Sequence, residues 1–150
     1  MTTNPLATVL QHAESERDQA LAALRRAEEQ WRRLQAQAEQ LLNYRGEYEQ
    51  RWSTRFAQRG TPEIVACYRS FNDRLDEAIV QQRAQASAAN AQCERLRAAL
   101  AAAELRVASV KKLIERRLAE QRRVQAMRDQ RQTDETAQHH RRRHAAPTQY

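Results

Sequence analysis

Apolar side chains recur at alternating steps of four and three residues through the first third of the chain. The positions are 6, 10, 13, 17, 20, 24, 27, 31, 34, 38, 41, 45, 48 and 52. Twelve of these 14 positions are apolar, and the exceptions are Arg17 and Arg45. A heptad pattern of this length predicts a long helix that buries a narrow stripe, or seam, against another helix. The stems of the two arginines can lie across that seam.

A second apolar stripe of the same spacing follows later in the chain. Its positions are Ala86, Ala89, Cys93, Leu96, Leu100, Ala103, Val107, Val110 and Ile114. Nearer the middle, Tyr68, Phe71, Leu75 and Ile79 are spaced by three, four and four residues. That eleven-residue rhythm locally relaxes a left-handed supercoil. We therefore expect a second long helix with its own seam.

The segment RGTPEI at residues 59–64 separates the two patterns. Gly60 suits a left-handed position after a helix, Thr61 suits a helix cap, and Pro62 favours the first position of the next helix. The Asn-Pro pair at residues 4–5 starts the first helix in a similar way. The chain should be all-α, with a helix at about 5–58, a turn at about 59–61 and a helix at about 62–135.

An antiparallel coiled-coil hairpin is the expected arrangement of these two helices. If the chain folds back about residue 60, contacting residues have numbers that sum to about 120, which sets Leu6 near Ile114 and Trp31 beside Ala89. Past Ile114 the apolar positions thin out, so residues 115–135 should extend as a single helix. The hairpin domain would span residues 1–137, followed by a disordered basic tail at 138–150.

The composition argues against an enzyme. Two glycines, three prolines and 30% charged residues are poor material for a globular domain with a pocket, and a glycine-rich phosphate loop is missing. We expect no catalytic residues, no cofactor and no metal. Three histidines, at 139, 140 and 144, surround Arg141 to Arg143, whose charge disfavours a cation, and a disordered tail offers no fixed geometry.

Cys67 and Cys93 lie on the same expected helix, roughly 39 Å apart along its axis, which is too far for a disulfide. We expect both to be buried thiols. There is no apolar run of 18 residues, and the N-terminal residues lack the pattern of a secretory signal. The expected location is therefore the cytoplasm.

Aromatic residues gather around the expected turn. Six of the eight rings fall within residues 44–71, at Tyr44, Tyr48, Trp52, Phe56, Tyr68 and Phe71. The heptad register places Tyr48 and Trp52 in the seam and Tyr44 at its edge. Rings in the seam widen the core where the hairpin closes, whereas an amphipathic ring beside the seam is typical of a protein-binding anchor.

The net charge of +7 is concentrated near the C-terminus. Residues 111–150 hold 11 Lys or Arg and 5 Asp or Glu, so they account for +6 of the total. Arginine clusters bind nucleic acid, acidic lipid or an acidic protein surface, and composition does not choose among these. A basic-zipper protein would carry its arginines before a parallel zipper, whereas here they follow a hairpin.

Three segments resemble the family of flagellar export proteins called FliJ. They are LLNYRGEY before the turn, CYRSFNDRLDEAIVQQR after it and DQRQTDETAQ near the end. The resemblance covers about residues 6–138. It implies an antiparallel coiled coil similar to the axle subunit of rotary ATPases, which inserts into the pore of the hexameric export ATPase FliI. It also implies contacts with the export-gate membrane protein FlhA and with export chaperones, and no catalysis by the chain itself.

The resemblance further implies two partner-binding surfaces. The expected gate surface comprises Gln37, Leu41, Tyr44, Tyr48, Phe71, Leu75, Ala78 and Gln82. Gln82 stands where some family members have histidine. The expected ATPase surface lies at the opposite end and includes Leu6, Leu10, Lys111, Lys112, Arg116 and Arg117.

Such a protein would be cytoplasmic and peripheral to the inner membrane. Its runner-up identity is the stalk component of a virulence-type injection apparatus, which would share the fold and the mechanism. A nucleic-acid-binding coiled coil is the alternative from a different class. That alternative explains the basic tail and leaves the aromatic residues without a role, so no nucleic acid partner is expected.

Overall fold

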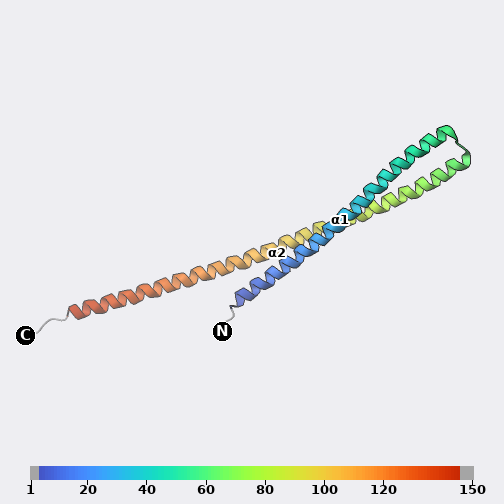
Figure 1. The fold of residues 1–150 in the computed structure, drawn as a ribbon. Coiled ribbons are helices and arrows are strands. Elements are labelled where there is room, and N and C mark those ends of the chain that lie inside the picture. The colour runs from blue at the N-terminus through green and yellow to red at the C-terminus, as the bar shows by residue number, and fades with distance from the viewer. Residues whose placement is uncertain (1–3, 146–150) are drawn as a thin grey trace, which may run out of the picture. The chain divides into compact units, whose positions relative to one another are not determined.

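The computed structural model describes residues 4–145 and contains two helices, α1 at Pro5–Gln58 and α2 at Pro62–His144 (Figure 1). No strand occurs within the described range. The prediction of an all-helical chain with two long helices packed against each other is therefore confirmed. The short link between them, drawn in green in Figure 1, covers residues 59–61.

Side chains cap both helices at their first turns. The backbone N–H of Leu6 donates to Oδ1 of Asn4 at 3.2 Å. The N–H of Ile64 donates to Oγ1 of Thr61 at 3.4 Å. These bonds satisfy amide groups that have no partner inside the helix, so the two caps expected from the sequence are confirmed.

Gly60 has a different role from the one expected. No described residue has a positive φ, so the prediction of a left-handed glycine after α1 is wrong. A Cβ on Gly60 would lie 3.3 Å from the backbone oxygen of Phe56, which is tighter than an ordinary contact. The link therefore favours glycine through a close approach to the end of α1, and not through a left-handed turn.

The second helix extends further than the sequence pattern suggested. Residues 138–144 were expected to belong to a disordered tail, but α2 continues through His144. This segment contains no glycine or proline, which would disfavour a helix. Arg141 to Arg143 and His144 lie in the last turn, where cations interact favourably with the helix dipole. Residues 146–150 of the expected tail lie outside the described residues.

The described chain divides into two compact units. The turn unit comprises residues 14–104, and the terminal unit combines residues 4–13 with residues 105–145. In the turn unit α1 and α2 run antiparallel. Three polar contacts join the helices there: Gln37 with Gln82 at 2.8 Å, Arg45 with Asp76 at 3.0 Å, and Glu28 with Arg97 at 3.4 Å.

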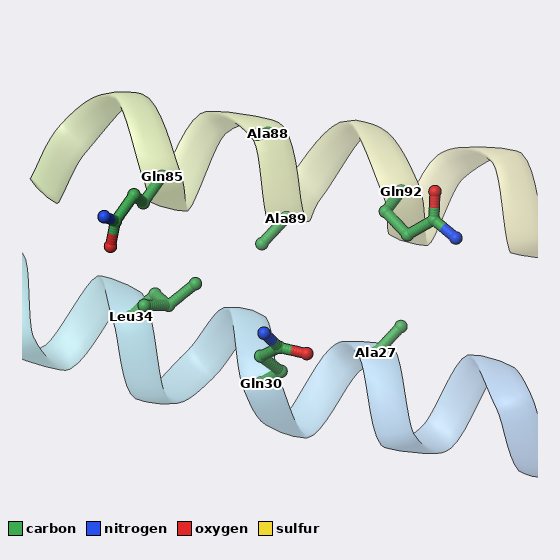
Figure 2. A pocket seen from close by; sticks show the side chains of 7 residues that line it. All are labelled: Ala27, Gln30, Leu34, Gln85, Ala88, Ala89 and Gln92. Atoms are coloured by element: carbon green, nitrogen blue, oxygen red, sulfur yellow. The ribbon is translucent and has the colours of Figure 1, made fainter. Parts of the chain in front are cut away.

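The first two pairs follow the expected antiparallel register, because their residue numbers sum to about 120. The Glu28–Arg97 pair joins two long side chains whose numbers sum to 125. A groove of about 390 Å³ farther from the turn shows the same register. Figure 2 shows its lining on the two helices: Ala27, Gln30 and Leu34 on α1, and Gln85, Ala88, Ala89 and Gln92 on α2. The alanines leave this groove because they are too small to fill the space between the helices.

The expected seam is the line of burial in both units. All 14 seam positions on α1 are buried or half-buried. The buried apolar residues of the described chain all belong to the seam positions: Ala13, Leu24, Ala38, Leu75, Ile79, Cys93, Ala103 and Val107. The heptad pattern therefore identified the buried face correctly on both helices.

The terminal unit buries much less. Ala13 and Val107 are buried there, and Leu6, Leu10, Val110 and Ile114 are half-buried. From residue 115 to residue 145 every side chain is exposed except the half-buried Val124. That residues 115–135 extend alone beyond the hairpin stays a prediction.

The two cysteines differ in environment. Cys93 is completely buried in the seam, as expected, whereas Cys67 is exposed and free. The prediction of a buried Cys67 is wrong because that residue precedes the seam position Tyr68 and lies beside the seam. Neither described helix contains a stretch that is both long and apolar enough to cross a bilayer.

Adjacent residues Ile79 and Val80 test the importance of the seam. Ile79 is 5% exposed and Val80 is 67% exposed. We expect Ile79→Ala to lower the free energy of unfolding by about 2–4 kcal/mol, because it leaves a cavity between the helices. Val80→Ala should change it by only about 0.5 kcal/mol. Urea unfolding followed by circular dichroism measures both values, and equal losses would contradict the assigned seam.

Candidate functional site

The aromatic residues form one continuous cluster in the turn unit. Tyr48 lies at its centre, with ring centroids 6.1 Å from Tyr44, 5.7 Å from Trp52, 5.8 Å from Tyr68 and 4.6 Å from Phe71. Offset and edge contacts at these distances are favourable for aromatic rings. Since Tyr48 is on α1 and two of its neighbours are on α2, this ring joins the helices.

A second group of contacts continues the cluster toward the turn. Tyr68 on α2 lies 5.4 Å from Trp52 and 5.3 Å from Phe56, measured between ring centroids. All three rings are half-buried. These rings fill the space between the helices near the turn. Farther from the turn, small seam residues such as Ala38 and Ala89 fill less of that space.

Exposure separates the rings into two classes. Tyr44 is 45% exposed and Phe71 is 38% exposed, whereas Tyr48 is half-buried between them. Tyr44 and Phe71 come from different helices and contact the same central ring. A partner could therefore reach rings on both helices at once, and the cluster both closes the hairpin and presents aromatic surface.

The expected gate surface is only partly exposed. Gln37, Tyr44 and Phe71 are exposed, Leu75 is buried, and Leu41, Tyr48, Ala78 and Gln82 are half-buried. Direct contacts connect two groups of its members: Gln37 with Gln82, and Tyr48 with both Tyr44 and Phe71. All eight residues belong to the turn unit. Leu75 can support this surface, but its burial leaves it little area for a partner.

Two polar contacts cross between the helices at this surface. Nε2 of Gln82 donates to Oε1 of Gln37. Each amide keeps further hydrogen-bonding capacity, because a glutamine side chain has two donors and two acceptor lone pairs. Nε of Arg45 is shielded from solvent and lies 3.0 Å from Oδ1 of Asp76, without the geometry of a hydrogen bond.

Sequence reasoning missed a groove beside the rings. It measures about 470 Å³ and is lined by Tyr44, Tyr48, Arg51, Trp52, Thr54 and Arg55. The guanidinium carbon of Arg55 lies 6.0 Å from the centroid of the Trp52 ring, within the range of a cation–π contact. Arg51 and Arg55 are four residues apart beside the seam positions 48 and 52, and that spacing was the available signal.

The expected ATPase surface belongs to the terminal unit. Leu6 and Leu10 are half-buried seam residues, so they contribute mainly to helix packing. The four cations of this surface, Lys111, Lys112, Arg116 and Arg117, are exposed. They form a basic stretch on α2 that an acidic partner surface could contact.

Further along α2, Arg123 forms an ion pair with Glu120. Nη2 of Arg123 donates to Oε1 of Glu120 at 2.7 Å. This hydrogen bond and the positive charge of Arg123 lower the pKa of Glu120. Both side chains are exposed, so salt screens the pair. The charge of Glu120 therefore neutralises that of Arg123 within the basic segment of α2.

Tyr48 and Tyr44 should contribute differently to stability. Tyr48→Ala removes the ring that joins four others, and we expect the free energy of unfolding to fall by about 2–3 kcal/mol. Tyr44→Ala removes a partly exposed ring with one aromatic neighbour, and the loss should be about 1 kcal/mol or less. Thermal and urea unfolding by circular dichroism compare the two variants. A larger loss for Tyr44→Ala would show that Tyr44 belongs to the core.

Comparison with known proteins gave one family. The model described as flagellar FliJ protein matches residues 2–146, nearly the entire sequence. Neither the curated proteins nor the solved structures contained a match.

Proposed function

The chain belongs to the flagellar FliJ family, and from that membership we propose that it is a non-enzymatic coupling factor of flagellar protein export. The family itself indicates a role in flagellar export. The finer proposal is an axle-like coiled coil that enters the hexameric export ATPase FliI, promotes its assembly and its ATP turnover, and links it to the gate protein FlhA and to export chaperones. The chain itself hydrolyses nothing.

The observation that carries this proposal is the family match over residues 2–146. The helical structure is compatible with it, because two antiparallel helices with a narrow seam present long exposed faces to partners. The proposed location is the cytoplasm, at the inner face of the membrane. There the chain would reach the membrane through its contact with the gate protein.

The gate contact is proposed at the aromatic surface of the turn unit. Tyr44 and Phe71 offer exposed rings on neighbouring helices, and Tyr48 supports both. Exposed aromatic rings on a rigid support lose little conformational freedom on binding, which is why such rings often dominate protein interfaces. Gln37 and Gln82 would form the polar edge of this interface.

The ATPase contact is proposed at the terminal unit. Lys111, Lys112, Arg116 and Arg117 are exposed beside the half-buried seam residue Ile114, and their charge suits an acidic surface. Electrostatic contacts of this kind mainly raise the rate of association and select the partner. Leu6 and Leu10 would support the surface by packing in the seam.

Co-purification with the export ATPase tests the main proposal. We expect the untagged chain to associate with the ATPase and to stimulate ATP hydrolysis in a steady-state assay. A variant that replaces the four cations of the ATPase surface with glutamine should stimulate less, because it loses the electrostatic contact. The matched control replaces four exposed arginines of α1 with glutamine: Arg25, Arg26, Arg32 and Arg33.

No association and no stimulation by the unmodified chain would refute the coupling role. Equal effects of the two four-residue variants would show that net charge matters and that the assigned surface does not. Removing residues 136–150 should leave ATPase binding largely intact. Complete loss of binding on that truncation would place the interface in the C-terminal segment and contradict the assignment.

Tyr44 provides the test of the gate surface. We expect Tyr44→Ala to weaken binding to the cytoplasmic domain of the gate protein by about tenfold or more, as for an exposed aromatic anchor. Val80→Ala is the control, because Val80 is exposed on α2 and lies outside the surface. Calorimetric titration measures both. Unchanged affinity for Tyr44→Ala, with normal helix content, would remove Tyr44 from the interface.

The injection-apparatus alternative shares the fold and the mechanism, so it differs only in the partner ATPase. The nucleic-acid alternative rests on the basic segment of α2, whose exposed side chains carry most of the net charge. It gives no role to the exposed rings of the turn unit. Binding to nucleic acid would show a steep dependence on salt concentration, whereas the gate contact at Tyr44 should be much less sensitive to salt.

A further inference from the structure

The last turns of α2 bring two histidines together. His140 and His144 have ring centroids 4.8 Å apart, with their ring planes at 86°. Both side chains are exposed, and both residues lie within the helix. Two sequence-based objections stood against a metal site, the charge of Arg141 to Arg143 and the expected disorder of residues 138–144. The helix removes the second objection.

The spacing of this pair suits one metal ion. Residues four apart lie on the same face of a helix, one turn above each other. Two histidines at this spacing can bind a single ion, as in the helical motif of zinc proteases. Imidazole nitrogen is a preferred ligand of copper, nickel and zinc ions.

We propose that His140 and His144 form a two-imidazole site for a divalent late transition-metal ion, namely Cu²⁺, Ni²⁺ or Zn²⁺. Water molecules complete the coordination, since no cluster of three or more His, Cys, Asp or Glu suited to a metal exists within residues 4–145. The site lies outside both partner surfaces assigned above and does not depend on the proposed export role.

The three intervening arginines weaken the site without blocking it. Successive residues on a helix point about 100° apart, so Arg142 projects to the side opposite the histidines. Arg141 and Arg143 flank the histidine face, because each is three residues from one of the two histidines. Their charge still repels a cation at short range. The carbonyl end of the helix acts in the opposite direction, because the last turn carries a partial negative charge. His144 is the last residue of α2.

The nearest acidic group on the same face is too distant to serve as a ligand. A shallow groove along this face is lined by Asp129, Gln132, Thr133, Thr136, Ala137 and His140. Asp129 is 11 residues before His140, which corresponds to roughly 16 Å along the helix. The ion would therefore be held by the two imidazoles and water, and a modest affinity follows from so few protein ligands.

Binding should stabilise the end of α2. An ion that bridges residues one turn apart binds the helical form and not the unfolded form, so it shifts the local equilibrium toward the helix. Amide groups of residues 137–144 should then exchange more slowly with solvent. Metal binding would thereby control how far the helix persists toward the C-terminus.

Calorimetric titration of the untagged full-length chain with NiCl₂ tests the site. We expect saturable binding of one ion per chain. His140→Ala and His144→Ala should each weaken binding by about tenfold or more, since each removes one of two ligands. His139→Ala is the matched control, because its ring points about 100° away from His140 and lies off the shared face.

Hydrogen exchange with and without NiCl₂ supplies an independent readout. Slower exchange at residues 137–144 in the unmodified chain, and no change in His144→Ala, would support the helical site. Absence of saturable binding would overturn the proposal. Equal weakening by all three alanine variants would also overturn it, because it would indicate binding to a histidine-rich segment without a defined pair.

Discussion

The structure depends on burial along one narrow line between two helices. Buried apolar side chains are few among residues 4–145, and half of them are small: Ala13, Ala38, Ala103 and Cys93. Small residues let the helix backbones approach closely, but each contributes little buried apolar area. The chain therefore needs additional area where large residues can meet across the seam. The ring cluster near the turn supplies it, with Tyr48 and Tyr68 in contact between α1 and α2.

A seam of small, interchangeable residues specifies register weakly, and the polar contacts compensate for this. A shift of one helix past the other would separate Gln37 from Gln82 and Arg45 from Asp76. Partly exposed ion pairs and hydrogen bonds of this kind add little net stability. Their value is that alternative registers would leave the shielded Nε of Arg45 without its nearby carboxylate.

The same rings connect packing to the proposed function. Tyr48 holds Tyr44 and Phe71 at fixed positions while leaving a large part of each exposed. A partner that binds these rings would meet a surface already ordered by the hairpin, which reduces the entropic cost of binding. The adjacent groove with Arg51 and Arg55 adds positive charge to one edge of that surface. An acidic residue on the partner would suit that edge.

The amino-acid sequence by itself determined which residues face the seam, because the helical repeat requires apolar positions every three and four residues and this pattern is local. It also separated Tyr48 in the seam from Tyr44 at its edge. The four-residue spacing of Arg51 and Arg55 places both on one face of α1, but only the structure shows that they and the neighbouring rings enclose a groove. The structure likewise revealed the close approach of Gly60 to the backbone oxygen of Phe56.

The histidine pair shows the same division. The four-residue spacing of His140 and His144 is visible in the sequence. Whether residues 138–144 form a helix depends on the helix propensity of each residue, and the pattern of apolar positions gives no information about it. The structure continues α2 through His144 and so places the two rings together. Periodic burial determines the long helices, whereas contacts between side chains outside the seam depend on how the helices are placed and where they end.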